Sequence, residues 1–108
     1  MGEIKKRPQV ISDLIAIATY IGENNLEASD SFLLAAEETF RELGNFPQMG
    51  RLCQFSHPKL ADIRQIGIKG FRKYLIFYCL IENGIEILRV IHGIRDIEVI
   101  LEDYLDVN

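Results

Sequence analysis

The chain has few of the residues that mark a secreted, membrane-bound or metal-binding protein. Its 108 residues include only two cysteines, Cys53 and Cys79, which lie far apart and have no cysteine partner nearby. Isolated thiols of this kind are typical of reduced, structural cysteines in a reducing compartment. No apolar run approaches the roughly 20 residues that span a bilayer, and Gln9, Ser12 and Asp13 interrupt the place where a signal peptide has its apolar core. We therefore expect a cytoplasmic protein without a membrane segment.

Several catalytic patterns are also missing. The sequence has no serine–histidine–acid trio, no glycine-rich phosphate loop and no paired carboxylates at catalytic spacing. The histidines His57 and His92 have no further ligands at metal-binding spacing, so we expect no metal and no other cofactor. For His92 two interpretations stay open. It is either a structural histidine at a strand end, bonded near Asp96 or to the backbone, or a catalytic base.

The charges are segregated along the chain. The formal net charge of −4 argues against nonspecific binding of nucleic acid. Residues 51–73 nevertheless contain a single acid, Asp62, and a group of cations. These cations are Arg51, Lys59, Arg64, Lys69, Arg72 and Lys73. We expect Arg64, Lys69, Arg72 and Lys73 to form an electropositive patch that attracts an acidic partner, with a solvated face as the alternative.

The hydrophobic periodicity predicts an α+β protein. Apolar residues at helical spacing predict a helix that begins at Pro8 and stops near Gly22, and a second one over residues 26–43 that ends at Gly44. The short connection makes them an antiparallel pair. Residues 1–7 allow a short edge strand, residues 45–59 form a loop, and strands follow at 60–68, 74–81 and 85–91. Asp96 then caps a short helix with Ile97, Ile100, Leu101 and Tyr104 on one side. We expect one domain over residues 1–108, with both N-terminal helices on a twisted antiparallel sheet of three to four strands.

The last two strands predict a hairpin with a defined register. Asn83 and Gly84 suit a two-residue turn, which places Glu82 opposite Ile85. The pairs that follow are Leu80 with Ile87, Tyr78 with Arg89 and Ile76 with Ile91. One face then carries Tyr74, Ile76, Tyr78, Leu80, Ile87, Arg89 and Ile91, and the other carries Leu75, Phe77, Cys79, Leu88 and Val90. We expect the second, apolar face to rest on the helices and the first, mixed face to bind a partner. Alternatively, Arg89 and Tyr78 form an internal polar pair that fixes the register.

Two segments resemble toxins of the RelE/ParE superfamily, which belong to type II toxin–antitoxin systems. They are KGFRKYLIFY at residues 69–78 and ILRVIHGIRD at residues 87–96. Weaker similarity extends over almost the whole chain. The resemblance implies the small α+β toxin fold and a cognate antitoxin as partner. It is also compatible with a homodimer or a toxin–antitoxin hetero-oligomer.

The superfamily divides by mechanism, and the residues here favour one branch. RelE-type members cleave mRNA on the ribosome with basic side chains, an arginine after the last strand and a C-terminal tyrosine. Arg95 matches that arginine, but Tyr74 and Ile100 occupy the other two positions. The chain is therefore more similar to the ParE branch, which binds DNA gyrase, although Cys79 replaces an arginine that many relatives carry. A non-toxic member that binds only its antitoxin is a third alternative. The expected target-binding or antitoxin-binding residues are Tyr74, Tyr78, Arg89, Arg95, Arg64 and Arg72, and the weak catalytic candidates are Arg95 and His92.

Overall fold

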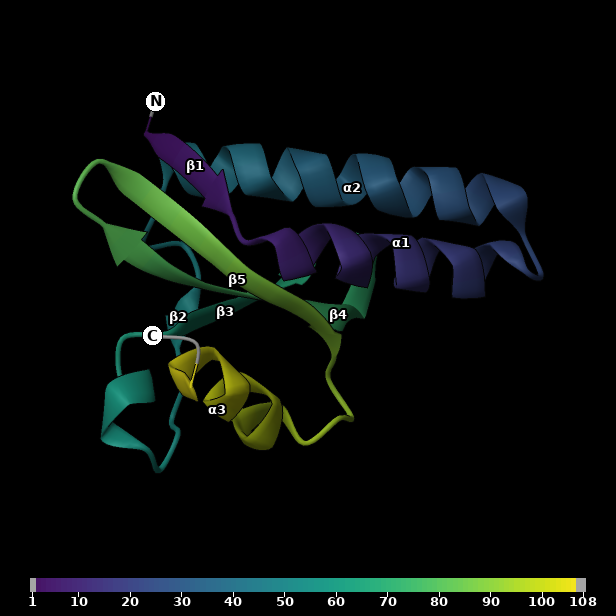
Figure 1. Cartoon of the computed structure of the whole chain (residues 1–108). Helices are drawn as coiled ribbons and strands as arrows, with labels where there is room; N and C mark the ends of the chain where they lie inside the picture. The colour runs from purple at the N-terminus through teal and green to yellow at the C-terminus, as the bar shows by residue number, and fades with distance from the viewer. Residues whose placement is uncertain (1, 107–108) are drawn as a thin grey trace.

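The computed structural model describes residues 2–106, with side chains as far as residue 102 (Figure 1). The elements in order are β1 (Glu3–Lys6), α1 (Pro8–Gly22), α2 (Leu26–Asn45), β2 (Arg51–Leu52), the 3₁₀ turn η1 (Pro58–Leu60), β3 (Arg64–Ile68), β4 (Phe71–Ile81), β5 (Gly84–His92) and α3 (Ile97–Asp106). The predicted α+β class, with two N-terminal helices and a short C-terminal helix, is confirmed. None of the helices within the described residues is both long and apolar enough to cross a membrane.

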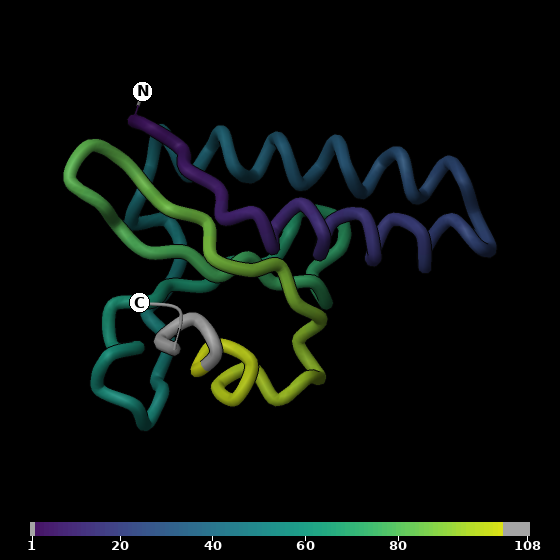
Figure 2. The backbone as a smooth tube through the Cα atoms, viewed as in Figure 1, coloured from purple at the N-terminus to yellow at the C-terminus, as the bar shows by residue number. Residues whose placement is uncertain are grey.

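The two long helices begin where the local sequence predicts. Pro8 occupies the first turn of α1, where its missing N–H leaves no helical bond unmade. The Asn25 side chain accepts a hydrogen bond from the Ala28 N–H and so caps α2. The Ser29 hydroxyl donates to the Ala18 carbonyl oxygen at 2.8 Å and ties the helices together. They lie side by side as an antiparallel pair (Figure 2).

The sheet is larger than predicted and is not wholly antiparallel. Its strand order is β1-β5-β4-β3-β2, and β3, β4 and β5 pair antiparallel as expected. Two differences lie at the edges. The first strand pairs parallel with β5, and Arg51–Leu52 forms a two-residue strand where only a loop was predicted. The predicted strand at 60–68 begins only at Arg64, because residues 58–60 form η1.

The predicted hairpin register is wrong. Ile81 pairs with Gly84, so the two-residue loop is Glu82–Asn83 rather than Asn83–Gly84. Gly84 is needed for a different reason: a Cβ there would collide with the backbone of Glu3 on the adjacent β1. No described non-glycine residue has a positive φ, so Asn83 does not adopt the left-handed conformation on which the turn prediction depended.

A bulge in β5 shifts the register once more. Tyr78 pairs with Ile87, but the residue before it in β4, Phe77, pairs with Arg89 and not with Leu88. Leu88 is therefore the extra residue, which is the arrangement of a β-bulge. The predicted pairs of Tyr78 with Arg89, Leu80 with Ile87 and Ile76 with Ile91 do not form.

The helices cover the opposite face of the sheet from the one expected. The buried sheet residues under α1 and α2 are Ile68, Ile76, Tyr78, Ile85, Ile87 and Val90. Phe77, Leu88 and Ile91 instead form a second core with Leu60, Ile63 and Leu101, which come from β4, β5, η1, α3 and the segment between η1 and β3. Figure 1 shows α3 on the other side of the sheet from α1 and α2. Tyr74, Ile76, Tyr78 and Ile87 of the predicted mixed face thus pack beneath the helix pair. Ile91 lies in the second core and Leu80 is exposed, while Val90 packs under the helices as predicted. Tyr104, which was expected to pack from the last helix, lies outside the side chains that the structure describes.

Candidate functional site

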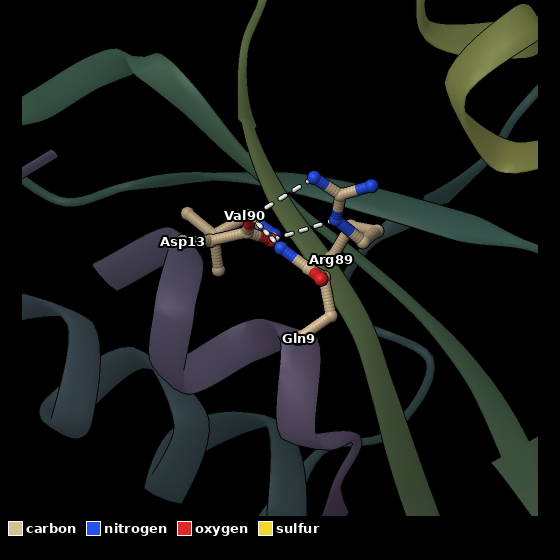
Figure 3. Close-up of polar contacts among 4 residues, drawn as sticks. All are labelled: Gln9, Asp13, Arg89 and Val90. Carbon is tan, nitrogen blue, oxygen red and sulfur yellow. Dashed lines mark hydrogen bonds and ion pairs between the residues drawn. The ribbon is translucent and has the colours of Figure 1, made fainter. Parts of the chain in front are cut away.

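Arg89 is held inside the protein by an acid from the first helix (Figure 3). Its Nε and Nη2 atoms donate to the two carboxylate oxygens of Asp13 at 2.8 and 2.9 Å. Asp13 also accepts from the Val90 N–H at 3.0 Å and from Gln9 Nε2 at 3.3 Å. The side chain of Asp13 is 8% exposed, and that of Arg89 is 24% exposed. A bidentate, largely desolvated pair of this kind occupies one edge of the guanidinium and neutralises its charge.

The position of this cluster follows from the end of β1. The register of β1 ends where Lys6 pairs with Ile87, and the Arg7 N–H then donates to the Ile87 carbonyl at 3.1 Å. Beyond that point the outer edge of β5 has no neighbouring strand, so its N–H groups need other acceptors. Asp13, in the second turn of α1, supplies an acceptor for Val90. The predicted polar pair of Arg89 with Tyr78 is therefore wrong, because the partner is Asp13.

Tyr78 is completely buried and is also engaged. Its hydroxyl donates to the Pro47 carbonyl oxygen at 2.8 Å and accepts from the Gly50 N–H at 2.8 Å. A Cβ at position 50 would lie 2.6 Å from this hydroxyl, so only glycine fits there. Burial raises the pKa of Tyr78, although the Gly50 hydrogen bond and the Arg64 charge oppose the rise. The expectation that Tyr78 lies on a partner-binding surface is wrong.

Arg64 belongs to the same internal arrangement. Its guanidinium donates to the Gly50 carbonyl oxygen at 2.7 Å and to the Gln48 carbonyl oxygen at 3.4 Å. Arg64 and Tyr78 together hold the loop after α2 against β3 and β4. The predicted electropositive patch therefore loses one of its four members to a structural role, while Lys69, Arg72 and Lys73 remain exposed.

The exposed candidates lie at the other end of the hairpin, around a hollow of about 460 Å³. Its lining residues are Arg72, Lys73, Leu75, His92, Gly93 and Ile94; we call this the basic hollow. The Gly93 N–H donates to the Lys73 carbonyl oxygen at 2.7 Å and closes the end of the β4–β5 pair. Arg95 directly follows Ile94 of the hollow and is exposed, on the loop between β5 and α3.

Aromatic rings support this end of the sheet from within. The Tyr74 ring meets the His92 ring edge to face at a centroid distance of 5.0 Å. Tyr74 and Phe71 each meet Phe32 of α2 in the same manner, at 5.4 Å. Burial raises the pKa of Tyr74, with a smaller rise from Tyr20, so its hydroxyl stays protonated at neutral pH.

His92 has a structural hydrogen bond at the strand end. Its Nδ1 atom accepts from the Ile94 N–H at 3.2 Å, which confirms the predicted bond to the backbone. An accepting imidazole nitrogen carries no proton, so the neutral ring bears its proton on Nε2. The lining of the basic hollow combines the cations Arg72 and Lys73 with the apolar side chains of Leu75 and Ile94. This combination suits the binding of an acidic group.

A second, larger hollow was not predicted from the sequence. It has a volume of about 940 Å³ and lies between the end of α2 and the tip of the β4–β5 hairpin. Phe46, Met49 and Leu80 line it and are exposed. The signal that could have revealed it is the pair of large apolar residues, Phe46 and Met49, in a loop outside any periodic pattern.

The two cysteines pack in the hydrophobic core and are not grouped with other potential metal ligands in the described part of the chain. Cys53 and Cys79 are free thiols, as predicted, and both belong to the core beneath α3. Burial raises the pKa of Cys53 to about 11, a rise that Arg51 partly offsets. Across the residues that the structure describes, no three His, Cys, Asp or Glu side chains gather as metal ligands.

Comparison with known proteins identifies the family. No curated protein matches this sequence. The family described as ParE toxin of type II toxin-antitoxin system, parDE, matches residues 4–97, which is most of the 108-residue chain. This match confirms the resemblance carried by the strand segments at residues 69–78 and 87–96. The chain therefore belongs to the ParE toxin family of type II toxin–antitoxin systems.

Proposed function

We propose that this toxin acts by binding DNA gyrase and that a cognate antitoxin neutralises it by binding in turn. Family membership carries the proposal. The distribution of charged groups supports it, because the exposed cations Arg72, Lys73 and Arg95 gather near one end of the sheet. We further propose that residues 1–108 act as one domain in the cytoplasm.

The runner-up function is cleavage of mRNA on the ribosome. Such cleavage needs a base near the 2′-hydroxyl and cations around the developing charge on phosphorus. Tyr74 stands where the endonucleases carry a strand arginine, and its raised pKa disfavours the phenolate that a base would need. Arg89 is neutralised by Asp13. These observations favour binding over cleavage.

Two assays on the purified chain separate these functions. The first measures supercoiling of relaxed plasmid by gyrase, and we expect inhibition together with cleaved DNA bound to gyrase. The second is primer extension on an mRNA that is being translated in vitro, and we expect no new cleavage ends. Unimpaired supercoiling together with cleavage of the translated mRNA would replace the proposal with the endonuclease function. Inactivity in both assays, with antitoxin still bound, would indicate the non-toxic alternative.

A further inference from the structure

We propose that the basic hollow binds a segment of the antitoxin that carries carboxylates beside an apolar side chain. The assignment of this segment to the antitoxin depends on the proposed function. The chemical class of the ligand does not depend on that function, because it follows from the residues that line the hollow.

The first argument is charge. The chain as a whole has 16 acids and 12 lysines and arginines. The hollow, in contrast, is lined by Arg72, Lys73 and His92 and by no acid. The two cationic side chains are exposed, and no described hydrogen bond or ion pair engages them. A local excess of positive charge on an acidic protein attracts and orients a negatively charged segment.

The second argument is the apolar surface beside these cations. Ile94 is 87% exposed, although a branched aliphatic side chain gains free energy when it leaves water. Leu75 is half-buried and also lines the hollow. An apolar side chain of the partner would cover both residues while neighbouring carboxylates reach Arg72 and Lys73.

The third argument is rigidity. The Gly93–Lys73 backbone bond and the Ile94–His92 bond hold the turn, while the Tyr74 ring packs against His92. A site that is already ordered loses little conformational entropy when a partner binds. The same packing disfavours the binding of nucleic acid in the hollow. Base stacking needs an open ring face, whereas the Tyr74 ring is half-buried between His92 and Phe32.

The test begins with a peptide and needs neither gyrase nor antitoxin. The probe is a short fluorescent peptide that alternates glutamate with leucine, titrated with the full chain and followed by anisotropy at low salt. Two further probes are a twin peptide with lysine for glutamate and a single-stranded DNA of similar length. We expect the acidic peptide to bind, the basic twin not to bind, and the Arg72→Glu/Lys73→Glu variant to bind the acidic peptide about tenfold more weakly. We expect Ile94→Ser to weaken it as well.

The control is Arg41→Glu, because Arg41 is an exposed cation on α2 outside the hollow. All variants lie at exposed positions, and thermal melting checks that they remain folded. Equal binding of the acidic peptide by Arg72→Glu/Lys73→Glu and by Arg41→Glu would overturn the proposal. Tighter binding of the DNA than of the acidic peptide, lost in the same double variant, would overturn it in favour of a nucleic-acid site.

A second arm tests the assignment to the antitoxin. The probe is the purified cognate antitoxin, titrated with the same variants. Weaker binding by the double variant supports the assignment. If the double variant binds the antitoxin as tightly as the wild type does but no longer binds the peptide, the assignment is overturned. Because the supercoiling assay is separate, its failure would concern the proposed function alone.

Discussion

Two arginine sites of this sheet, Arg89 within β5 and Arg72 at the start of β4, differ in what surrounds the charge. Arg89 is largely buried, and both of its hydrogen-bonded arms end on Asp13. Arg72 is exposed beside Lys73 and borders a hollow without acids. A paired, desolvated arginine serves the fold, whereas an unpaired, hydrated arginine is available to a partner. The side chain alone does not distinguish the two, so the difference lies in the partner that the fold supplies.

The largest expected effect comes from removing the buried arginine. We expect Arg89→Ala to lower the free energy of unfolding by about 4 kcal/mol, because it leaves the Asp13 carboxylate buried without its counter-ion. Urea unfolding followed by circular dichroism measures the loss. The exposed Arg41→Ala should change stability by less than about 0.5 kcal/mol. An unfolding midpoint of Arg89→Ala equal to that of the wild type would refute the structural role of Arg89.

The second effect concerns the buried tyrosine. We expect Tyr78→Phe to cost about 3 kcal/mol, because it leaves the Pro47 carbonyl and the Gly50 N–H without their partner inside the protein. The same urea titration measures the cost. Tyr20→Phe is the matched control, since Tyr20 is 67% exposed. Equal stability of the two variants would mean that the Tyr78 hydroxyl contributes nothing to the fold.

The third effect appears at high pH. The pKa of Cys53 is raised from 9.0 to about 11 in the folded protein, so the native state keeps its proton longer than the unfolded chain does. This contribution is fully present below pH 9 and is lost as the pH rises towards 11, for a total of roughly 2 kcal/mol. Stability of the wild type and of Cys53→Ala across this range measures it. A decline that is equally steep in both proteins would assign the loss to other groups, such as Tyr74 and Tyr78.

The smallest effect on stability is expected in the basic hollow. Arg72→Glu and Lys73→Glu, alone or together, should change the free energy of unfolding by less than about 0.5 kcal/mol, because both side chains are exposed. Thermal melting beside Arg41→Glu measures the change. A loss comparable to that of Arg89→Ala would show that these cations are structural too, and the contrast between the two sites would disappear.

Local patterns predict the helices and the order of the elements well. Pro8 and Asn25 lie at helix starts, where a fixed φ and a side-chain bond act over a few residues. Gly44 was predicted to end the second helix, but α2 continues to Asn45 and Gly44 does not have a positive φ. The orientation of the sheet was not predictable in this way. The contrast between a mixed and an apolar face indicated the wrong side, because both faces are covered and both contribute buried apolar residues.

The contacts of the site residues were even harder to predict, because their partners lie far away in the sequence. Leu88 is an extra residue whose effect on the register appears only when β4 is alongside. Asp13 and Arg89 are 76 positions apart, and nothing in the sequence around either one indicates the other. Arg72 and Lys73 are exposed, as the predicted electropositive patch requires, because that prediction used the local run of cations and no distant partner.

The most direct test of the contrast between the two sites measures urea unfolding and acidic-peptide binding for Arg89→Ala and for Arg72→Glu/Lys73→Glu side by side. We predict that Arg89→Ala loses about 4 kcal/mol of stability, whereas Arg72→Glu/Lys73→Glu unfolds with the wild type and binds the acidic peptide about tenfold more weakly. Binding of the peptide at wild-type strength by the folded Arg72→Glu/Lys73→Glu variant would contradict the account, because the exposed cations of the basic hollow would then have no part in binding a partner.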